Sequence, residues 1–168
     1  MMASQGKGKT AYMGLLLAFA LILSYVESLI PFFFGIPGMK LGLANLAVLL
    51  TLLLFGAGEA LTINIGRILL SSFLFGNMSM LLYSMAGGLL SFLVMVLMKK
   101  TKKFSITGIS MGGGVFHNIG QLLVAFIVVE TKSIFYYLPV LLVAGVVTGF
   151  LNGLITTTVY PHLSVGTE

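Results

Sequence analysis

The chain has 168 residues, of which 58% are hydrophobic and only 8% are charged. About a quarter of the residues of a soluble domain are charged, so this composition excludes a soluble protein and predicts one embedded in a membrane. The net charge of +5 comes from lysines that flank apolar stretches, which indicates membrane topology rather than a surface for nucleic acid. The sequence also contains no cysteine and no aspartate, so disulfides and thiol chemistry are excluded.

Six apolar stretches follow one another along the chain and predict six membrane-spanning helices. They cover about residues 12–30, 41–55, 60–75, 78–98, 105–129 and 135–160. The first stretch resembles a secretory signal, but its full span length and the lack of a cleavage motif favour a retained helix. No linker divides the chain, so we expect residues 1–168 to form a single integral membrane domain.

The lysines predict how the helices are oriented. Lys7 and Lys9 precede the first helix, and four lysines lie between residues 99 and 103, after the fourth helix. Lysines flanking membrane helices are retained in the cytoplasm. We therefore expect an all-α, six-helix bundle in the bacterial cytoplasmic membrane, with both termini in the cytoplasm.

Small residues recur at intervals of four along several of these helices. Gly145, Gly149 and Gly153 are one example, and Gly14 and Ala18 in the first helix are another. Small residues one turn apart let helix backbones approach closely in lipid. Most of these pairs predict packing inside the bundle, whereas Gly14 and Ala18 are the candidates for docking to another protein.

Polar side chains inside the apolar stretches are the candidate ligand contacts, because such groups are costly in lipid and face partners or cavities. All of them except Arg67, which lies at mid-depth, are expected at or beyond the midplane on the outer side. His117 and Gln121 share one helix face, with Asn118 beside them. This one-sided distribution predicts a ligand pocket that opens outward. The candidates are Glu27, Lys40, Asn45, Arg67, Tyr83, His117, Asn118, Gln121, Tyr136 and Tyr137.

A structural interpretation is open for most of these residues. Asn118 and Gln121 are also the kind of residue that bonds neighbouring helices, and His117 is also typical of a structural histidine. The side chain of Arg67 is long enough to extend outward and pair with Glu27. Lys40 also fits an ordinary interfacial lysine. For Glu59, at the start of the third helix, we expect a structural role, because a carboxylate suits the amino end of a helix.

Nothing in the sequence favours catalysis. The chain has no H-E-x-x-H pair and no phosphate-binding loop. Without aspartate it has no aspartate-rich site for magnesium and diphosphate. We expect a protein that is not itself an enzyme and that uses no cofactor or metal.

Several segments resemble one family closely. They are PGMKLGLANLAVLL, GRILLSSFLFGN, YSMAGGLLSFLVM, FHNIGQLLVA and YYLPVLLVAGVVTGFLNG. Over roughly residues 12–158 the chain resembles the Gx transporter family, also described as component I of heptaprenyl diphosphate synthase. That family is similar to the substrate-binding S components of energy-coupling factor (ECF) transporters. The resemblance implies a six-helix bundle with an outward pocket. It also implies docking of the first helix, through Gly14 and Ala18, onto a coupling subunit driven by ATPases.

Three functional hypotheses follow. The first is an S-component-like subunit of an ECF importer that captures a small, partly apolar metabolite such as a vitamin, quinone precursor or isoprenoid. Here His117, Asn118 and Gln121 bind the ligand, Arg67 and Lys40 meet an anionic group, the tyrosines stack or cap, and residues 31–40 form a lid. The second is a non-catalytic accessory subunit in heptaprenyl diphosphate or menaquinone biosynthesis, partnered by a soluble prenyl synthase. The third is an autonomous transporter driven by protons through His117 and Glu27.

Overall fold

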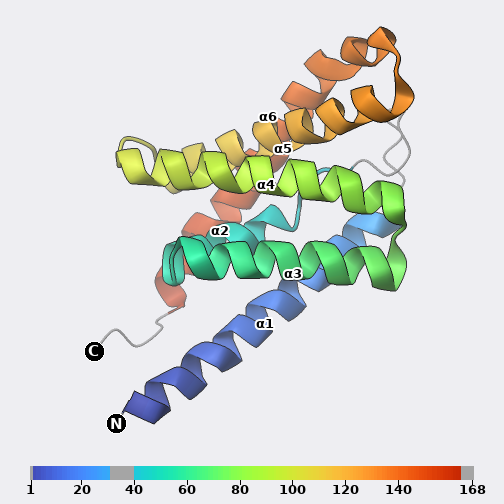
Figure 1. Cartoon of the computed structure of the whole chain (residues 1–168). Coiled ribbons are helices and arrows are strands. Elements are labelled where there is room, and N and C mark those ends of the chain that lie inside the picture. The colour runs from blue at the N-terminus through green and yellow to red at the C-terminus, as the bar shows by residue number, and fades with distance from the viewer. Residues whose placement is uncertain (1, 31–39, 164–168) are drawn as a thin grey trace.

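Helices are the only regular secondary structure in the part of the chain that the computed structural model describes, residues 2–30 and 40–163 (Figure 1). The expectation of an all-α protein is confirmed for these residues. The proposed lid, residues 31–40, lies outside them except for Lys40. The elements are α1 (Met2–Leu29), α2 (Asn45–Leu54), α3 (Ala57–Phe75), α4 (Met78–Thr101), α5 (Ile106–Val129) and α6 (Leu138–Val159), with the 3-10 helices η1 (Lys132–Tyr137) and η2 (Tyr160–His162).

Four helices begin three or more residues from the expected position, and one of them is α3, which begins at Ala57 instead of residue 60. Helix α1 begins at Met2 instead of near residue 12, because its polar first residues contain no proline that would stop a helix. Helix α2 begins at Asn45 instead of residue 41, since Gly42 has a φ of 88°, which a right-handed helix does not allow. Helix α6 begins at Leu138 instead of residue 135, with Pro139 in its first turn, where a missing N–H costs nothing.

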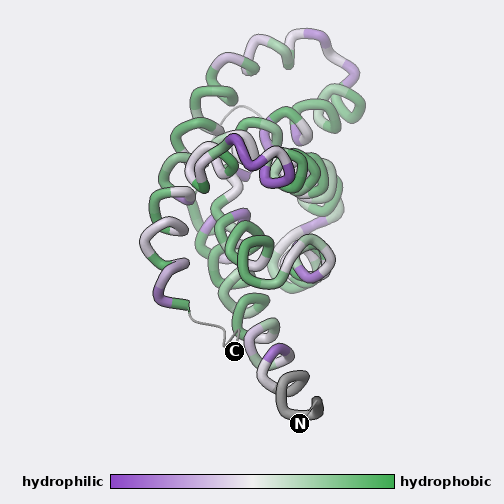
Figure 2. Tube along the Cα trace, turned by 90° about the vertical axis from the view of Figure 1, so that its left-hand side faces the viewer, coloured by the Kyte–Doolittle hydropathy of each residue, from purple (hydrophilic) through white to green (hydrophobic). Residues whose placement is uncertain are grey.

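Four helical segments are long and apolar enough to cross a membrane. They are Gly8–Leu29, Met78–Thr101, Ile106–Val129 and Lys132–His162. Helix α2 has 10 residues and is therefore ~15 Å long, about half the thickness of a hydrocarbon core. Helix α3 has 19 residues, but it carries Glu59 and buries Asn64 and Arg67. Figure 2 shows hydrophobic residues along most of the helices, with hydrophilic residues gathered at several of the connections.

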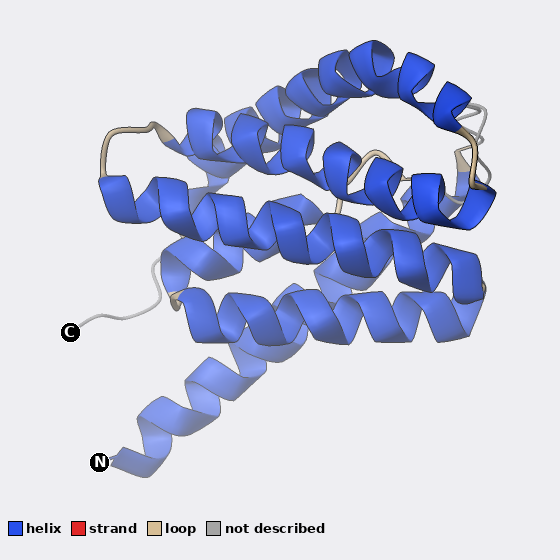
Figure 3. Ribbon diagram, turned by 45° about the horizontal axis from the view of Figure 1, so that its top comes forward, coloured by secondary structure: helices blue, strands red, loops and turns tan. Residues whose placement is uncertain are grey.

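Glycines set the close packing of α4, α5 and α6. A Cβ atom on Gly145 would lie 2.7 Å from the carbonyl oxygen of Gly114 in α5, and one on Gly149 would lie 2.6 Å from the Cα atom of Met111. On the other side of α5, a Cβ atom on Gly120 would lie 2.7 Å from the carbonyl oxygen of Ala86 in α4. The prediction that the glycines of the sixth helix pack inside the bundle is confirmed. Figure 3 shows α3 running beside α4, while the first turns of α1 project away from the other helices.

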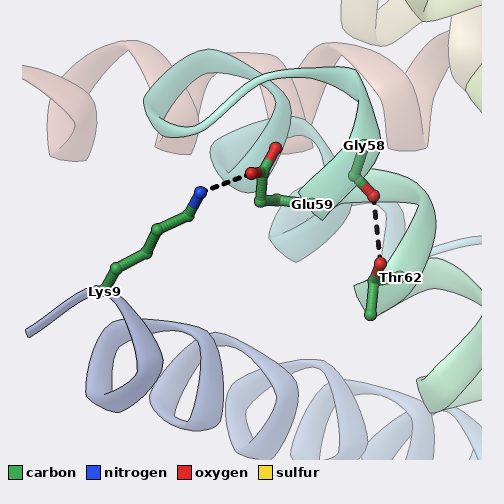
Figure 4. Close-up of polar contacts among 4 residues, drawn as sticks. All are labelled: Lys9, Gly58, Glu59 and Thr62. Carbon is green, nitrogen blue, oxygen red and sulfur yellow. Dashed lines mark hydrogen bonds and ion pairs between the residues drawn. The ribbon is translucent and has the colours of Figure 1, made fainter. Parts of the chain in front are cut away.

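Lys9 and the four lysines between residues 99 and 103 lie at one end of the bundle, which we call the lysine end. The ammonium group of Lys9 lies 2.5 Å from Oε1 of Glu59 in the first turn of α3, so Glu59 joins α1 to α3 (Figure 4). At the same end, Nζ of Lys99 donates a hydrogen bond of 2.5 Å to the carbonyl oxygen of Leu52, near the end of α2. Both ends of the described chain also lie here, since Tyr160 packs into the apolar cluster that contains Leu16 of α1.

Candidate functional site

The main irregularity of the bundle is the segment of residues 40–44, which leads into α2. Its backbone is not helical, yet Lys40, Leu41 and Ala44 are buried, and Gly42 has a left-handed φ of 88°. Apart from two turn bonds, from the N–H groups of Asn45 and Leu46 to the carbonyl oxygens of Gly42 and Leu43, the segment lacks the internal hydrogen bonds of a helix. Inside a membrane domain its N–H and C=O groups must be satisfied by other parts of the protein. The side chains that do this identify the polar interior.

Four side chains from three helices bind the backbone of this segment, and we call them the backbone clamp. Gln121 of α5 accepts a hydrogen bond from the N–H of Lys40 and donates one to its carbonyl oxygen, each 2.7 Å long. Glu27 of α1 accepts from the N–H of Gly42, and from that of Leu43 at 3.3 Å. Thr148 and Asn152 of α6 donate to the carbonyl oxygens of Leu41 (3.3 Å) and Gly42 (3.1 Å), respectively.

Arg67 is buried beside the clamp, with 2% of its surface exposed. Its Nη2 atom donates to the side-chain oxygens of Asn64 (2.9 Å) and Asn45 (3.2 Å), and its Nε atom donates to Asn64 at 3.2 Å. Asn64 in turn donates to the carbonyl oxygen of Gly88 in α4 at 2.9 Å. Within residues 2–30 and 40–163 no ion pair joins Arg67 to Glu27, because the carboxylate is used on the backbone of Gly42 and Leu43. Arg67 therefore fixes α3 to α2 and, through Asn64, to α4.

His117 lies at the centre of this region, with 1% of its surface exposed. Neither ring nitrogen makes a hydrogen bond of good geometry in the described part of the chain, although the backbone of Gly87 lies close enough to interact with the ring. Glycines make room for the ring, since a Cβ atom on Gly42 or on Gly87 would lie 3.0 Å from its Cδ2 or Cε1 atom. Its neighbour Asn118 has a structural contact, because its Nδ2 atom donates to the carbonyl oxygen of Leu141 in α6 at 2.7 Å.

The structure thus gathers most of the predicted site residues in one place. Glu27, Asn45 and His117 contact Gly42, Arg67 is bonded to Asn45, and Lys40 lies two residues before Gly42. We call these five buried residues the polar centre. Asn118 and Gln121 adjoin it, but their side chains bond the backbone: Asn118 bonds the neighbouring helix α6, as its structural interpretation predicted, whereas Gln121 bonds the irregular segment.

The three predicted tyrosines lie elsewhere. Tyr83 is buried in an apolar cluster with Leu122 and Leu141. Tyr136 and Tyr137 are 86% and 40% exposed at the start of α6. Among the described residues, none of the three tyrosines bonds a residue of the polar centre, and Tyr83 is explained as part of the apolar core. The predicted docking residues Gly14 and Ala18 are exposed on α1, and space is open around Gly14.

Four residues of this region were not predicted as site residues, although the sequence carries a signal for three of them. Asn64 precedes Arg67 by three residues and so shares its helix face. Thr148 and Asn152 are four apart on α6, among the three glycines that face α5. Gly42 had no such signal, because only the three-dimensional path of the backbone shows its left-handed φ.

An apolar groove of about 710 Å³ runs along the other side of the irregular segment. Thr148 supplies the one polar side chain in its described lining, and that hydroxyl is bonded to the backbone. The α6 side chains that line it are half-exposed, so the groove faces the surroundings of the bundle. Residues of the segment and of α6 form its walls, chiefly Leu41, Leu43, Val140, Val143, Val147 and Leu151.

These features define a class of protein: a helical protein with four helices able to cross a membrane, an irregular segment held by buried polar side chains, and an apolar groove beside it. The chain belongs to the family described as heptaprenyl diphosphate synthase component I, whose model matches residues 16–159. No curated protein and no solved structure matches the chain in the corresponding comparisons.

Proposed function

We propose that this protein is the non-catalytic membrane subunit of a heptaprenyl diphosphate synthase, and that its groove holds the prenyl chain while a separate soluble subunit carries out the chemistry. The family description supports the link to this synthase. The sequence supports the division of labour, since it has no aspartate with which to bind magnesium and diphosphate. This role replaces ECF import as our first hypothesis.

The apolar groove is the observation that carries the proposal. Its volume of about 710 Å³ falls within the range of ~300–1,000 Å³ typical of ligand sites. Its walls are aliphatic side chains of α6 together with Leu41 and Leu43, and these offer a prenyl chain dispersion contacts without a polar cost. A long prenyl chain is poorly soluble in water, so a membrane subunit with such a groove would keep it accessible to a soluble enzyme.

We further propose that the lysine end of the bundle faces the cytoplasm of the cell, which places both termini and the partner enzyme on that side. The retention of lysines in the cytoplasm supports this orientation. The position of both described chain ends at the lysine end supports an even number of crossings. In this arrangement α3 crosses the membrane, although it is less apolar than the four long segments. The short helix α2, together with the irregular segment, forms one further membrane crossing.

Copurification and a product assay test the proposal. The full-length protein in vesicles is mixed with an aspartate-rich prenyl synthase from the same cell, and products are analysed by chain length. We expect stable association and a larger share of long products than the synthase gives alone. Recovery of transporter subunits without any synthase, together with an unchanged product distribution, would contradict it.

A pair of matched variants tests the role of the groove. Val147 lines the groove, whereas its neighbour Val146 does not, and both are aliphatic side chains of α6 exposed by more than a third. Val147→Phe fills part of the groove and should shorten the products. Val146→Phe adds the same ring outside the groove and should leave them unchanged. An equal effect of the two substitutions would argue against the groove as the chain-binding site.

The second candidate function is the substrate-binding subunit of an ECF importer, and the exposed small residues of α1 favour it. No atom lies within 4 Å of a Cβ atom on Gly14, and Ala18 is exposed one turn later. Such a face permits close approach of a partner helix. If this function is correct, the protein copurifies with a coupling subunit and its ATPases, and Gly14→Leu abolishes the association. Association that persists in Gly14→Leu would count against docking through this face.

A further inference from the structure

The polar centre contains buried polar atoms that the described protein does not satisfy. They are Oε2 of Glu27, Nδ2 of Asn45 and both ring nitrogens of His117. These residues are at most 5% exposed. Nearly all buried polar atoms in proteins are hydrogen-bonded, so an unpartnered group in an ordered core points to a missing ligand, ion or water. Here four such atoms belong to three residues of one cluster.

The three residues converge on Gly42 from different sides. Oε1 of Glu27 accepts a hydrogen bond from the N–H of Gly42. The unpartnered Oε2 atom of the same carboxylate therefore lies near that backbone. A Cβ atom on Gly42 would lie 2.9 Å from Nδ2 of Asn45 and 3.0 Å from Cδ2 of His117. Nδ2 of Asn45 and the Cδ2 edge of the His117 ring thus pack against Gly42, where a methyl group would not fit. The three residues that carry unsatisfied atoms therefore all adjoin Gly42.

The charges of the polar centre do not balance. Lys40 and Arg67 both interact electrostatically with Glu27 and with His117. Arg67 is bonded to two neutral side-chain amides, and the hydrogen bonds found for Lys40 come from its backbone. If Glu27, Lys40 and Arg67 keep their usual charges and His117 is neutral, the centre holds two positive charges and one negative charge. A net positive charge among apolar helices is costly unless an anion neutralises it.

We infer that the polar centre binds an anionic group of the phosphate or diphosphate type. Lys40 provides an ammonium group, Asn45 an amide N–H, and His117 a ring N–H, and each of these can donate to a phosphate oxygen. Glu27 is the acceptor of the set, and its free oxygen can accept a hydrogen bond from a protonated phosphate oxygen. A metal cation fits poorly, because the net charge of the centre is already positive.

The irregular segment places this anion site next to the apolar groove. Leu41 and Leu43 line the groove, whereas Gly42, between them, contacts the side chains of the polar centre. Alternate residues of the irregular segment thus face the apolar groove on one side and the polar centre on the other. An amphiphile with an anionic head and an apolar tail meets a matching surface on each side. Assigning the tail to a prenyl chain rests on the proposed function, whereas the anion site can be tested without it.

Binding measurements on the purified full-length protein, in nanodiscs of zwitterionic lipid, test the inference. The probes are inorganic pyrophosphate, farnesyl diphosphate and farnesol, measured by calorimetry and by the shift of the unfolding temperature. We expect pyrophosphate and farnesyl diphosphate to bind, with farnesyl diphosphate the tighter of the two. Repeating the titration in nanodiscs that contain phosphatidylglycerol identifies the source of the anion. If this anionic lipid weakens pyrophosphate binding, a lipid headgroup is the natural occupant of the site. If it does not, a free diphosphate is favoured.

Two lysine variants locate the site. Lys40→Gln removes a cation of the polar centre but leaves the backbone bonds to Gln121 intact, so the protein should fold. Lys132→Gln removes an equal charge from an exposed position in η1. We expect Lys40→Gln to weaken pyrophosphate binding by about tenfold or more, and Lys132→Gln to leave it unchanged.

Three results would overturn the inference. The first is the absence of pyrophosphate and farnesyl diphosphate binding by the folded wild-type protein. The second is equal binding by Lys40→Gln and Lys132→Gln, which would place any anion elsewhere. The third is binding of farnesol without binding of pyrophosphate, which would leave the groove and the proposed function in place and remove the anion site. The unfolding temperature of each variant without ligand verifies that a lost signal is not lost folding.

Discussion

Replacing Gln121 by methionine tests whether the buried amides hold the irregular segment in place. Methionine has nearly the same length as glutamine, so the substitution removes hydrogen bonds while it changes packing little. In the native protein the amide of Gln121 pairs with both the N–H and the carbonyl oxygen of Lys40, at 2.7 Å each. In the variant these two backbone groups remain buried without partners.

The expected loss of stability follows from those two groups. A buried unpaired donor or acceptor costs about 1–3 kcal/mol. Hydrogen bonds measured in membrane proteins average only ~0.6 kcal/mol, because the unfolded chain in the membrane also finds partners. Two groups therefore give a loss of about 1–6 kcal/mol, the lower limit from the membrane average and the upper limit from unpaired buried groups. For a domain of this size, this corresponds to a fall in unfolding temperature of roughly 2–24 °C.

Thermal and denaturant unfolding in detergent micelles measure this effect, with two further variants as references. Asn118→Leu removes one bond of 2.7 Å to the carbonyl oxygen of Leu141 and should cost about half as much. Thr158→Val removes an exposed bond within its own helix and should be nearly neutral. If Gln121→Met is no less stable than Thr158→Val, the amide does not hold the segment and our account of the backbone clamp is wrong.

Further substitutions test other parts of the fold. Gly42→Ala should destabilise the protein by roughly 2 kcal/mol or more in the same unfolding assay, because φ is 88° and its Cβ atom would meet Asn45 and His117. Gly145→Ala should lower the free energy of unfolding by roughly 2 kcal/mol or more, because its Cβ atom would lie 2.7 Å from the carbonyl oxygen of Gly114. Gly8→Ala serves as a neutral control, since the space around Gly8 is open. Lys9→Gln should leave the unfolding temperature unchanged, because its ion pair with Glu59 is solvent-exposed and such pairs contribute little.

The sequence was sufficient to predict the helices because apolar length and small-residue spacing are local signals. The third, fourth and fifth helices end within three residues of their expected limits, and the glycines of α6 pack as their spacing indicated. The irregular segment was not foreseen. Residues 41–44 are apolar or small and read as the beginning of a helix, and nothing local reveals that Gly42 has a left-handed φ.

The sequence predicted which residues lie together at the candidate site, but not what each of their side chains binds. Seven of the ten predicted ligand contacts lie in or beside the polar centre, because a polar residue in an apolar helix must face the protein interior. The sequence could not decide whether such a residue bonds a ligand or the backbone. That distinction depends on partners distant in the chain, as with Gln121 and Lys40, which are 81 residues apart. Thr148 and Asn152 were missed because their partners are carbonyl oxygens of a segment expected to be helical.

The same segment connects structure to function. A continuous helix over residues 40–54 would satisfy the carbonyl groups of residues 40–42 internally and would not need side-chain donors for them, although its first four N–H groups would still need acceptors. The chain instead places four buried polar side chains around a short non-helical segment, which is costly in a membrane domain. The segment brings Lys40 and Gly42 to the polar centre and Leu41 and Leu43 to the groove. A helix would distribute these residues around its axis every 100° instead of onto two opposite sides. The break before α2 is therefore what allows one short stretch of backbone to border an anion site and an apolar groove at the same time.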